Sequence, residues 1–314
     1  MASAFSPHIV IYAALTGNLL VAVTKFTAAA WTGSSAMLSE GVHSLVDTAN
    51  QGLMLYGIHR AAMPPDDMHP LGYGRELYFW CFIVALLIFS LGAGVSAYEG
   101  VTHILRPVAI QSPSINYVVL ALSFCFEGVT WWVAVREFQK QRGPLTYLEA
   151  ATRSRDPTTY LVLFEDSAAL LGILIAFIGT LCAEIFGMPE LDGLASIGIG
   201  LVLAATALFL ARESKSLLIG EPVREAKQRS LLQIARATPG ISSVSRLITV
   251  HLAPRQIVAA FDVDFVDDLK ASEIEATTRY LEREITIVHP EIIALFVTPK
   301  NSSVSQRERS KERT

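Results

Sequence analysis

Two residues that can bind a metal ion lie one helical turn apart within a long apolar stretch of the chain. They are His43 and Asp47, in SSAMLSEGVHSLVDTANQGLMLYG. A charged side chain at the centre of a bilayer costs roughly 2.5–3.5 kcal/mol on insertion scales, so an apolar helix that carries ionisable groups must give them partners or a function. Neutral imidazole and carboxylate oxygens suit Zn²⁺ and other first-row divalent ions. This pair therefore predicts a divalent-metal site.

Glu40 and Asn50 extend the pair into a stripe with successive spacings of three, four and three residues. Residues at these spacings share one face of a helix. Such a face cannot point at lipid, because polar groups find no partners there, so it must face another helix or a water-filled cavity. We expect Glu40 and Asn50 to line a cavity or to couple proton movement. A buried hydrogen-bond network between helices is the structural alternative.

A second acidic pair, Glu165 and Asp166, lies inside LVLFEDSAALLGILIAFIG. Adjacent residues on a helix point about 100° apart, so both carboxylates cannot face one point equally. We expect Asp166 to be a metal ligand and Glu165 to be a neighbouring ligand or charge partner. The alternative places Glu165 near the membrane interface with no role. Glu127, in CFEGVTWW, is expected to carry protons or to line the cavity.

Polar residues also occur in the first apolar stretch and in the segment that follows the stripe. Lys25 is expected to extend its ammonium group to the membrane surface, with an acidic neighbour as the alternative partner. Asp66 and His69, in PPDDMHPLGYGRELYFW, form a candidate secondary metal site in a loop. The alternative is a solvated turn made by the prolines and glycines.

The composition indicates which kind of secondary structure positions these side chains, namely membrane helices. Of 314 residues, 52% are hydrophobic and 17% are charged, and the mean hydropathy of +0.42 is too high for a soluble protein of this size. Apolar runs of about 20 residues are typical of membrane helices. The net charge of −4 gives no sign of nucleic-acid binding. The sequence predicts six spans, at about 8–30, 36–59, 77–104, 115–138, 159–185 and 192–211.

The distribution of basic residues predicts the orientation of these spans. Lys and Arg gather after the second, fourth and sixth spans, whereas the connection between spans five and six is acidic and the one between spans one and two has no Lys or Arg. Positive residues favour the cytoplasmic side. Both termini are therefore expected in the cytoplasm or its topological equivalent.

The composition changes after about residue 220. A helical stretch, REAKQRSLLQIARAT, precedes two alternating strands, a second helix and a last strand, IIALFVTP. The order α-β-β-α-β predicts a small α+β, ferredoxin-like cytoplasmic domain. We therefore expect a six-helix membrane domain over 1–220, this second domain over 221–300, and a polar, disordered tail over 301–314.

With these segments in place, the chain resembles the cation diffusion facilitator family of zinc transporters, from about residue 10 to residue 300. GNLLVAVTKFTAAAWTGSSAMLSEGVHSLVD is similar to the family's first two spans, and DDMHPLGYGRELYFW to its loop signature. The resemblance implies a secondary transporter, not an enzyme, that exports Zn²⁺ from the cytoplasm in exchange for protons. It also implies a homodimer joined through the terminal domain, with no cofactor besides the transported ion.

The chain departs from the family pattern at two ligand positions. Span five of the family carries a histidine four residues before the aspartate that matches Asp166, and Val162 stands there instead. Tyr73 stands where some members have a loop histidine. An oxygen-rich site of this kind is expected to favour harder ions such as Mn²⁺ over Zn²⁺, or to bind the metal more weakly. Transport of Mn, Fe or Co, or a non-transporting regulatory role, are therefore the alternatives. A bacterial inner membrane is the expected location, with an organelle membrane as the alternative.

Overall fold

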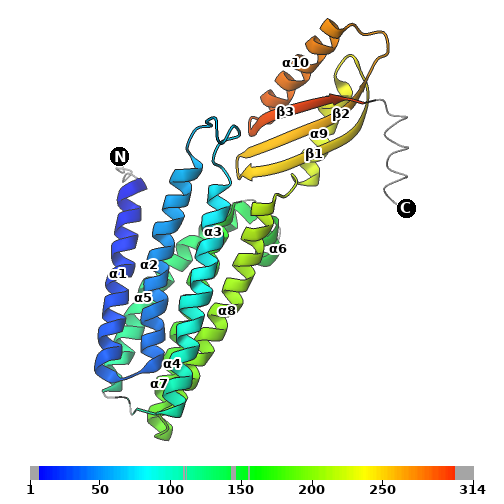
Figure 1. The fold of residues 1–314 in the computed structure, drawn as a ribbon. Coiled ribbons are helices and arrows are strands. Elements are labelled where there is room, and N and C mark those ends of the chain that lie inside the picture. Colours follow the sequence, from blue (N-terminus) through cyan, green and yellow to red (C-terminus); the bar gives the residue numbers. More distant parts are fainter. Residues whose placement is uncertain (1–6, 109, 111, 143–145, 155, 301–314) are drawn as a thin grey trace, which may run out of the picture. The chain divides into compact units, whose positions relative to one another are not determined.

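The structure is a computed structural model that describes residues 7–300, except 109, 111, 143–145 and 155 (Figure 1). The chain divides into two compact units. The first comprises the described residues up to His59 together with Glu76–Lys215, and the second comprises Arg60–Arg75 together with the described residues from Ser216 onward. The predicted tail, 301–314, lies outside the described residues. The predicted domain boundaries stay a prediction.

Long helices build the first unit (Figure 1). Most of them begin or end within a few residues of a predicted span, but the short helix Tyr147–Arg153 matches no predicted span and the last helix continues to Ile219. Their bounds are α1 (Pro7–Thr32), α2 (Ser35–Ala61), α3 (Glu76–Leu87), α4 (Gly94–Leu105), α5 (Pro113–Arg142), α6 (Tyr147–Arg153), α7 (Pro157–Phe186) and α8 (Glu190–Ile219).

Among the described residues, four segments are long and apolar enough to cross a membrane: Glu76–Leu105, Pro113–Arg136, Tyr160–Phe186 and Glu190–Ile219. A helical membrane architecture is thus confirmed, while the count of six spans stays a prediction. Helix α2 is less apolar because its buried face carries the polar stripe. Its side chains at the stripe face protein and not lipid, so a low hydropathy is compatible with a buried helix of a bundle.

The apolar segment Glu76–Leu105 is not a regular α-helix along its whole length. A π-helical turn, η1 (Ile88–Ala93), joins α3 to α4. Beyond this turn α4 approaches α8 very closely, since a Cβ built on Gly100 would lie 2.6 Å from the carbonyl oxygen of Gly193. Gly200 of α8 likewise lies against the backbone of Ala93 and Ala97. These glycines therefore let α4 and α8 pack backbone against backbone, as close helix contacts in membranes require.

The second unit contains a three-stranded sheet with two helices, in the predicted order. Helix α9 (Glu225–Ala237) precedes β1 (Ile241–Ala253) and β2 (Gln256–Phe265), and α10 (Ala271–Val288) precedes β3 (Ile292–Pro299). Strand β2 is central, antiparallel to β1 and parallel to β3. Alternate residues of β2 point to one face and pack with both helices in a single core: Leu231, Ala235, Ile257, Ala259, Phe261, Val263, Leu281 and Ile285.

Candidate metal site

Helix α2 carries the site, and a carboxylate from α8 fixes its first turn. Asp192 is fully buried. Its side chain accepts hydrogen bonds from the hydroxyl of Ser34 at 2.8 Å and from the backbone N–H groups of Ser35 and Ala36 at 2.6 and 3.2 Å. A carboxylate at this position satisfies N–H groups that have no partner within the helix and complements the helix dipole. Asp192 therefore anchors the depth and rotation of α2.

The polar stripe of α2 faces the interior of the first unit. Glu40, His43, Asp47 and Asn50 expose 0, 1, 7 and 1% of their surface. None of the four points at the lipid-facing side of the helix, as the spacing predicts. The helix therefore places two possible metal ligands and two further polar groups inside the bundle.

Helix α7 meets the stripe at Glu165. The side-chain amide of Asn50 donates a hydrogen bond of 2.7 Å to Glu165 Oε1, and the carboxyl groups of Asp47 and Glu165 are direct neighbours. His43 Nδ1 lies 3.3 Å from Asp47 Oδ1. Glu165 is buried within the first unit, and its depth in the membrane stays a prediction. The structure thus joins the predicted groups of α2 to one of the two acids of α7.

Several atoms of this group that could bind a metal ion are buried without a hydrogen-bond partner in the described part of the chain. They are both ring nitrogens of His43, Asp47 Oδ1 and Asp166 Oδ2. A buried polar atom without a partner costs roughly 1–3 kcal/mol, and such atoms in a native structure call for an explanation such as a bound ion. Lone pairs on imidazole and carboxylates are suited to a divalent cation.

The acids of α5 and α7 complete the surroundings of the site. Glu127 is buried on α5 and acts electrostatically on Asp47, Glu165 and Asp166. Asp166 is half-buried, and Val162, one turn earlier, offers no ligand atom. Within the described ranges, no three His, Cys, Asp or Glu side chains converge closely enough to hold a metal ion. The arrangement described here is therefore an open set of ligands and not a preformed cage.

Lys25 does not extend to the membrane surface, so that prediction is wrong. Its side chain is completely buried. The ammonium lies 3.0 Å from Glu40 Oε2 and donates a hydrogen bond of 2.8 Å to Ser44 Oγ. The alternative, an acidic partner, is what the structure has. Sequence could have suggested it, since a lysine and a glutamate in neighbouring apolar helices avoid isolated charges by pairing.

The loop candidates Asp66 and His69 lie together but in a different environment. Their side chains are about half exposed, with His69 Nδ1 3.4 Å from Asp66 Oδ1. The Asp66 carboxylate accepts hydrogen bonds from the hydroxyl of Tyr73 and from the backbone N–H groups of Met68 and His69. The Tyr73 hydrogen bond is the main cause that lowers the pKa of Asp66. These contacts are those of a self-bonded turn, and the loop metal site stays a prediction.

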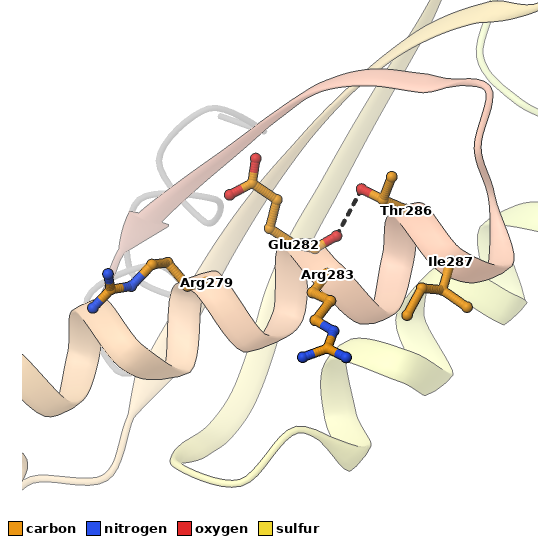
Figure 2. Close-up of a pocket in the computed structure, with 5 residues that line it drawn as sticks. All are labelled: Arg279, Glu282, Arg283, Thr286 and Ile287. Atoms are coloured by element: carbon orange, nitrogen blue, oxygen red, sulfur yellow. Dashed lines mark hydrogen bonds between the residues drawn. The ribbon is translucent and has the colours of Figure 1, made fainter.

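Two pockets lined by described residues lie away from the polar stripe of α2. An apolar pocket of about 290 Å³ lies between α5 and α7. A pocket of about 490 Å³ in the second unit lies along α10, where Arg279, Arg283 and Ile287 line it with Glu282 and Thr286 (Figure 2). In Figure 2 the hydroxyl of Thr286 bonds to the backbone oxygen of Glu282. With one carboxylate and two guanidinium groups, this pocket does not have the ligands of a cation site.

Two histidines near the sheet of the second unit, His251 and His289, are engaged in ordinary contacts. His251 Nδ1 lies 3.3 Å from the carbonyl oxygen of Ala253, and His289 Nε2 lies 2.9 Å from Ser230 Oγ. Both contacts are of the ordinary hydrogen-bonding kind.

Apolar helices around a buried set of imidazole and carboxylate groups are typical of a membrane transport domain. The chain belongs to the cation diffusion facilitator family, since residues 11–219 match the cation efflux transmembrane domain. It is 33% identical over 280 residues to the mouse (Mus musculus) mitochondrial proton-coupled zinc antiporter SLC30A9. The aligned residues make up 88% of this chain and 48% of that protein.

Two further relatives come from other organisms. Metal tolerance protein C4 of Arabidopsis thaliana is 32% identical over 256 residues, or 80% of this chain and 56% of that protein. The cation-efflux pump FieF of Citrobacter koseri is 21% identical over 278 residues, or 88% of this chain and 86% of that protein. The chain spans about half the length of the SLC30A9 relatives it matches.

Proposed function

We propose that this protein transports a divalent cation across a membrane, with Zn²⁺ as its main cargo, in exchange for protons. His43 and Asp47 of α2 and Asp166 of α7 are the proposed ligands, and Glu165 is the proposed fourth. The observation that carries the proposal is the set of buried donor atoms without partners on His43, Asp47 and Asp166. The names of the zinc antiporter relatives support the choice of cargo.

The chemistry of these ligands explains the exchange. Metal binding requires a neutral imidazole and ionised carboxylates, so binding of the metal releases protons from the same atoms. Asp47, Glu165 and Glu127 also surround one another closely, and adjacent like charges oppose their simultaneous ionisation. Either a divalent ion or protons can relieve this repulsion. One occupant therefore displaces the other.

Transport also requires that the site open to one side of the membrane at a time. A relative movement of the helix that carries His43 and Asp47 against the helix that carries Asp166 would complete the ligand set in one state and loosen it in another. Rocking of helix bundles around a site near the midplane is the usual means of alternating access. The open set of ligands described above is compatible with one end of such a movement.

The same proposal covers the topology, the direction of transport, the oligomeric state and the location of the protein. We propose six membrane spans with both termini on the cytoplasmic side, export from the cytoplasm, and a homodimer joined through the second unit. A bacterial inner membrane and an organelle membrane both fit, and the mitochondrial name of the SLC30A9 relatives supports the second.

Reconstitution in proteoliposomes with an imposed pH gradient tests this function. We expect Zn²⁺ flux that depends on the gradient, with protons moving in the opposite direction. The compartment that supplies Zn²⁺ should therefore become more acidic, and the compartment that receives Zn²⁺ more alkaline. The double variant Asp47→Ala/Asp166→Ala should abolish the flux, whereas Asp267→Ala, an exposed residue of the second unit, should not change it. Undiminished flux in the double variant would refute the ligand assignment.

The same assay distinguishes the alternatives. If the flux of Mn²⁺, Fe²⁺ or Co²⁺ exceeds the flux of Zn²⁺, Zn²⁺ is not the main cargo. Val162→His should then shift the preference toward Zn²⁺, because it adds an imidazole ligand. A folded protein that neither binds nor transports any of the four ions would favour the regulatory role.

A further inference from the structure

A buried ion pair lies directly beside the candidate metal site. Lys25 of α1 and Glu40 of α2 are both completely inaccessible to solvent, with Lys25 Nζ 3.0 Å from Glu40 Oε2. Ser44 supplies the second partner of the ammonium at 2.8 Å. A buried ion pair of this kind gains little or no net stability, because desolvation of both charges offsets their attraction. Its position therefore invites a role other than stability.

The ammonium group is close to the ligands as well as to Glu40. Glu40, Ser44 and Asp47 follow one another at spacings of four and three residues, so they form one continuous row on α2. Lys25 is held between the first two members of this row. Its charge acts through the protein interior on His43, Asp47 and Glu127. Asp47, three residues beyond Ser44 in this row, and Glu127 of α5 are therefore the other carboxylates on which the lysine acts.

The fold makes room for Glu40 in this position. A Cβ built on Gly172 of α7 would lie 2.3 Å from Glu40 Oε1, so only a glycine allows the carboxylate to sit there. That oxygen has no hydrogen-bond partner among the described residues, so Glu40 is held by Lys25 alone. Helix α7 thus opens a place for an acid whose hydrogen-bond partner among the described residues is the lysine.

We propose that Glu40 is a positioning residue that retains the Lys25 ammonium and so keeps it away from Asp47. The inference rests on the proposed function. A lysine that pairs with Asp47 would occupy a metal ligand with a competing positive charge. Glu40 therefore preserves the affinity of the site for a divalent cation without touching the ion itself.

Equilibrium Zn²⁺ binding to the purified full chain tests this role with three variants. Glu40→Gln keeps the size of the side chain but releases the lysine, and we expect the Kd for Zn²⁺ to rise by about tenfold or more, as expected for a unit positive charge close to a partly buried site. Adding Lys25→Met to Glu40→Gln removes the released charge and should return the Kd to within about threefold of the wild type. Lys25→Met alone should bind at least as tightly as the wild type.

A purely structural ion pair gives a different pattern. In that case the double variant would bind no better than Glu40→Gln, because it lacks both partners of the pair. That result, or an unchanged Kd in Glu40→Gln, would overturn the proposal. Thermal unfolding of each variant in detergent shows whether the protein remains folded.

A second variant covers the case in which Glu40→Gln does not fold. Gly172→Ala displaces the Glu40 carboxylate and changes no charge, so it should also raise the Kd, whereas Gly52→Ala of α2, whose added methyl meets no atom within 4 Å, should not. Equal Kd values for these two glycine variants would contradict the proposal. Wild-type protein that binds no Zn²⁺ would instead contradict the proposed function, so the two failures are distinct.

Discussion

The same two residue types meet in two regions of the molecule, with opposite surroundings. In the membrane unit His43 Nδ1 lies 3.3 Å from Asp47 Oδ1, and in the loop His69 Nδ1 lies 3.4 Å from Asp66 Oδ1. The side chains of the first pair expose 1 and 9% of their surface, and those of the second pair expose 48–50%. The distances alone would rank the two pairs as equal candidates for a metal site.

Their hydrogen bonds distinguish them. The Asp66 carboxylate already accepts bonds from Tyr73 and from two backbone N–H groups of its own loop. In the membrane unit both nitrogens of His43 and one oxygen of Asp47 have no hydrogen-bond partner among the described residues. An unsatisfied buried group gains much more from a ligand than a solvated and bonded one. Environment, and not residue type, therefore separates a binding site from a turn.

The largest expected difference is in metal affinity. Asp47→Asn removes a proposed ligand charge from the bilayer interior, and we expect the Kd for Zn²⁺ to rise by more than about 100-fold, since loss of an outer-shell partner alone costs 10–100-fold. Asp66→Asn keeps the loop's size and should change the Kd less than about twofold, because this carboxylate bonds to its own loop. Titration calorimetry on both variants measures the difference. Comparable losses would remove the distinction between the two regions.

The close contact of α4 with α8 should matter next. Gly100→Ala places a methyl group 2.6 Å from the carbonyl oxygen of Gly193, and overpacking of this kind costs about 1–3 kcal/mol. Gly128→Ala, whose added methyl meets no atom within 4 Å, is the matched control on α5. Thermal unfolding in detergent should show a lower Tm for Gly100→Ala only. Equal Tm values would mean that the helices separate freely at this point.

The anchor of α2 should have a somewhat smaller effect. Asp192→Ala leaves the first turn of α2 without its acceptor, at a cost of about 1–2 kcal/mol typical of a lost helix cap. Because α2 carries His43 and Asp47, we expect weaker Zn²⁺ binding along with the lower Tm. Asp192→Asn, which retains one acceptor oxygen, should recover part of both. A lower Tm with unchanged Zn²⁺ affinity would show that the anchor does not position the site.

The smallest effect is expected in the loop and depends on pH. Tyr73→Phe removes the hydrogen bond that is the main cause of the lowered pKa of Asp66, so this pKa should rise toward its ordinary value near 3.8. In the wild type a depressed carboxyl pKa stabilises the folded loop above the ordinary value, and the contribution disappears as the pH falls through the folded pKa. A ¹³C NMR titration of the Asp66 carboxyl group measures the change. An unchanged pKa in the variant would refute this explanation.

The polar stripe shows what the sequence could predict. Helical spacing alone indicated that Glu40, His43, Asp47 and Asn50 share a face, and the cost of charges in hydrocarbon indicated that the face is buried. In the second unit the alternation of apolar residues in β2 and the spacing of α10 predicted the element order for the same reason. Periodicity is a local property, so a single sequence contains it.

The features that could not be predicted from the sequence depend on residues that are distant from one another along the chain. Asp192 caps a helix that begins more than 150 residues earlier, and no local pattern joins the two. The burial of Lys25 depends on Glu40, together with the place that Gly172 leaves for it on a third helix. The π-helical turn at Ile88–Ala93 lies in an apolar run whose composition is that of any membrane helix. These features require the packing of helices to be known.

The number and location of bound Zn²⁺ ions test the central claim most directly. Equilibrium dialysis should give one tightly bound Zn²⁺ per chain in the wild type and in Asp66→Ala/His69→Ala, and none in Asp47→Ala/Asp166→Ala. X-ray absorption of the bound Zn²⁺ should show one imidazole nitrogen with oxygen ligands at about 2.0–2.2 Å. Loss of the ion in the loop variant, with retention in the membrane variant, would contradict the account.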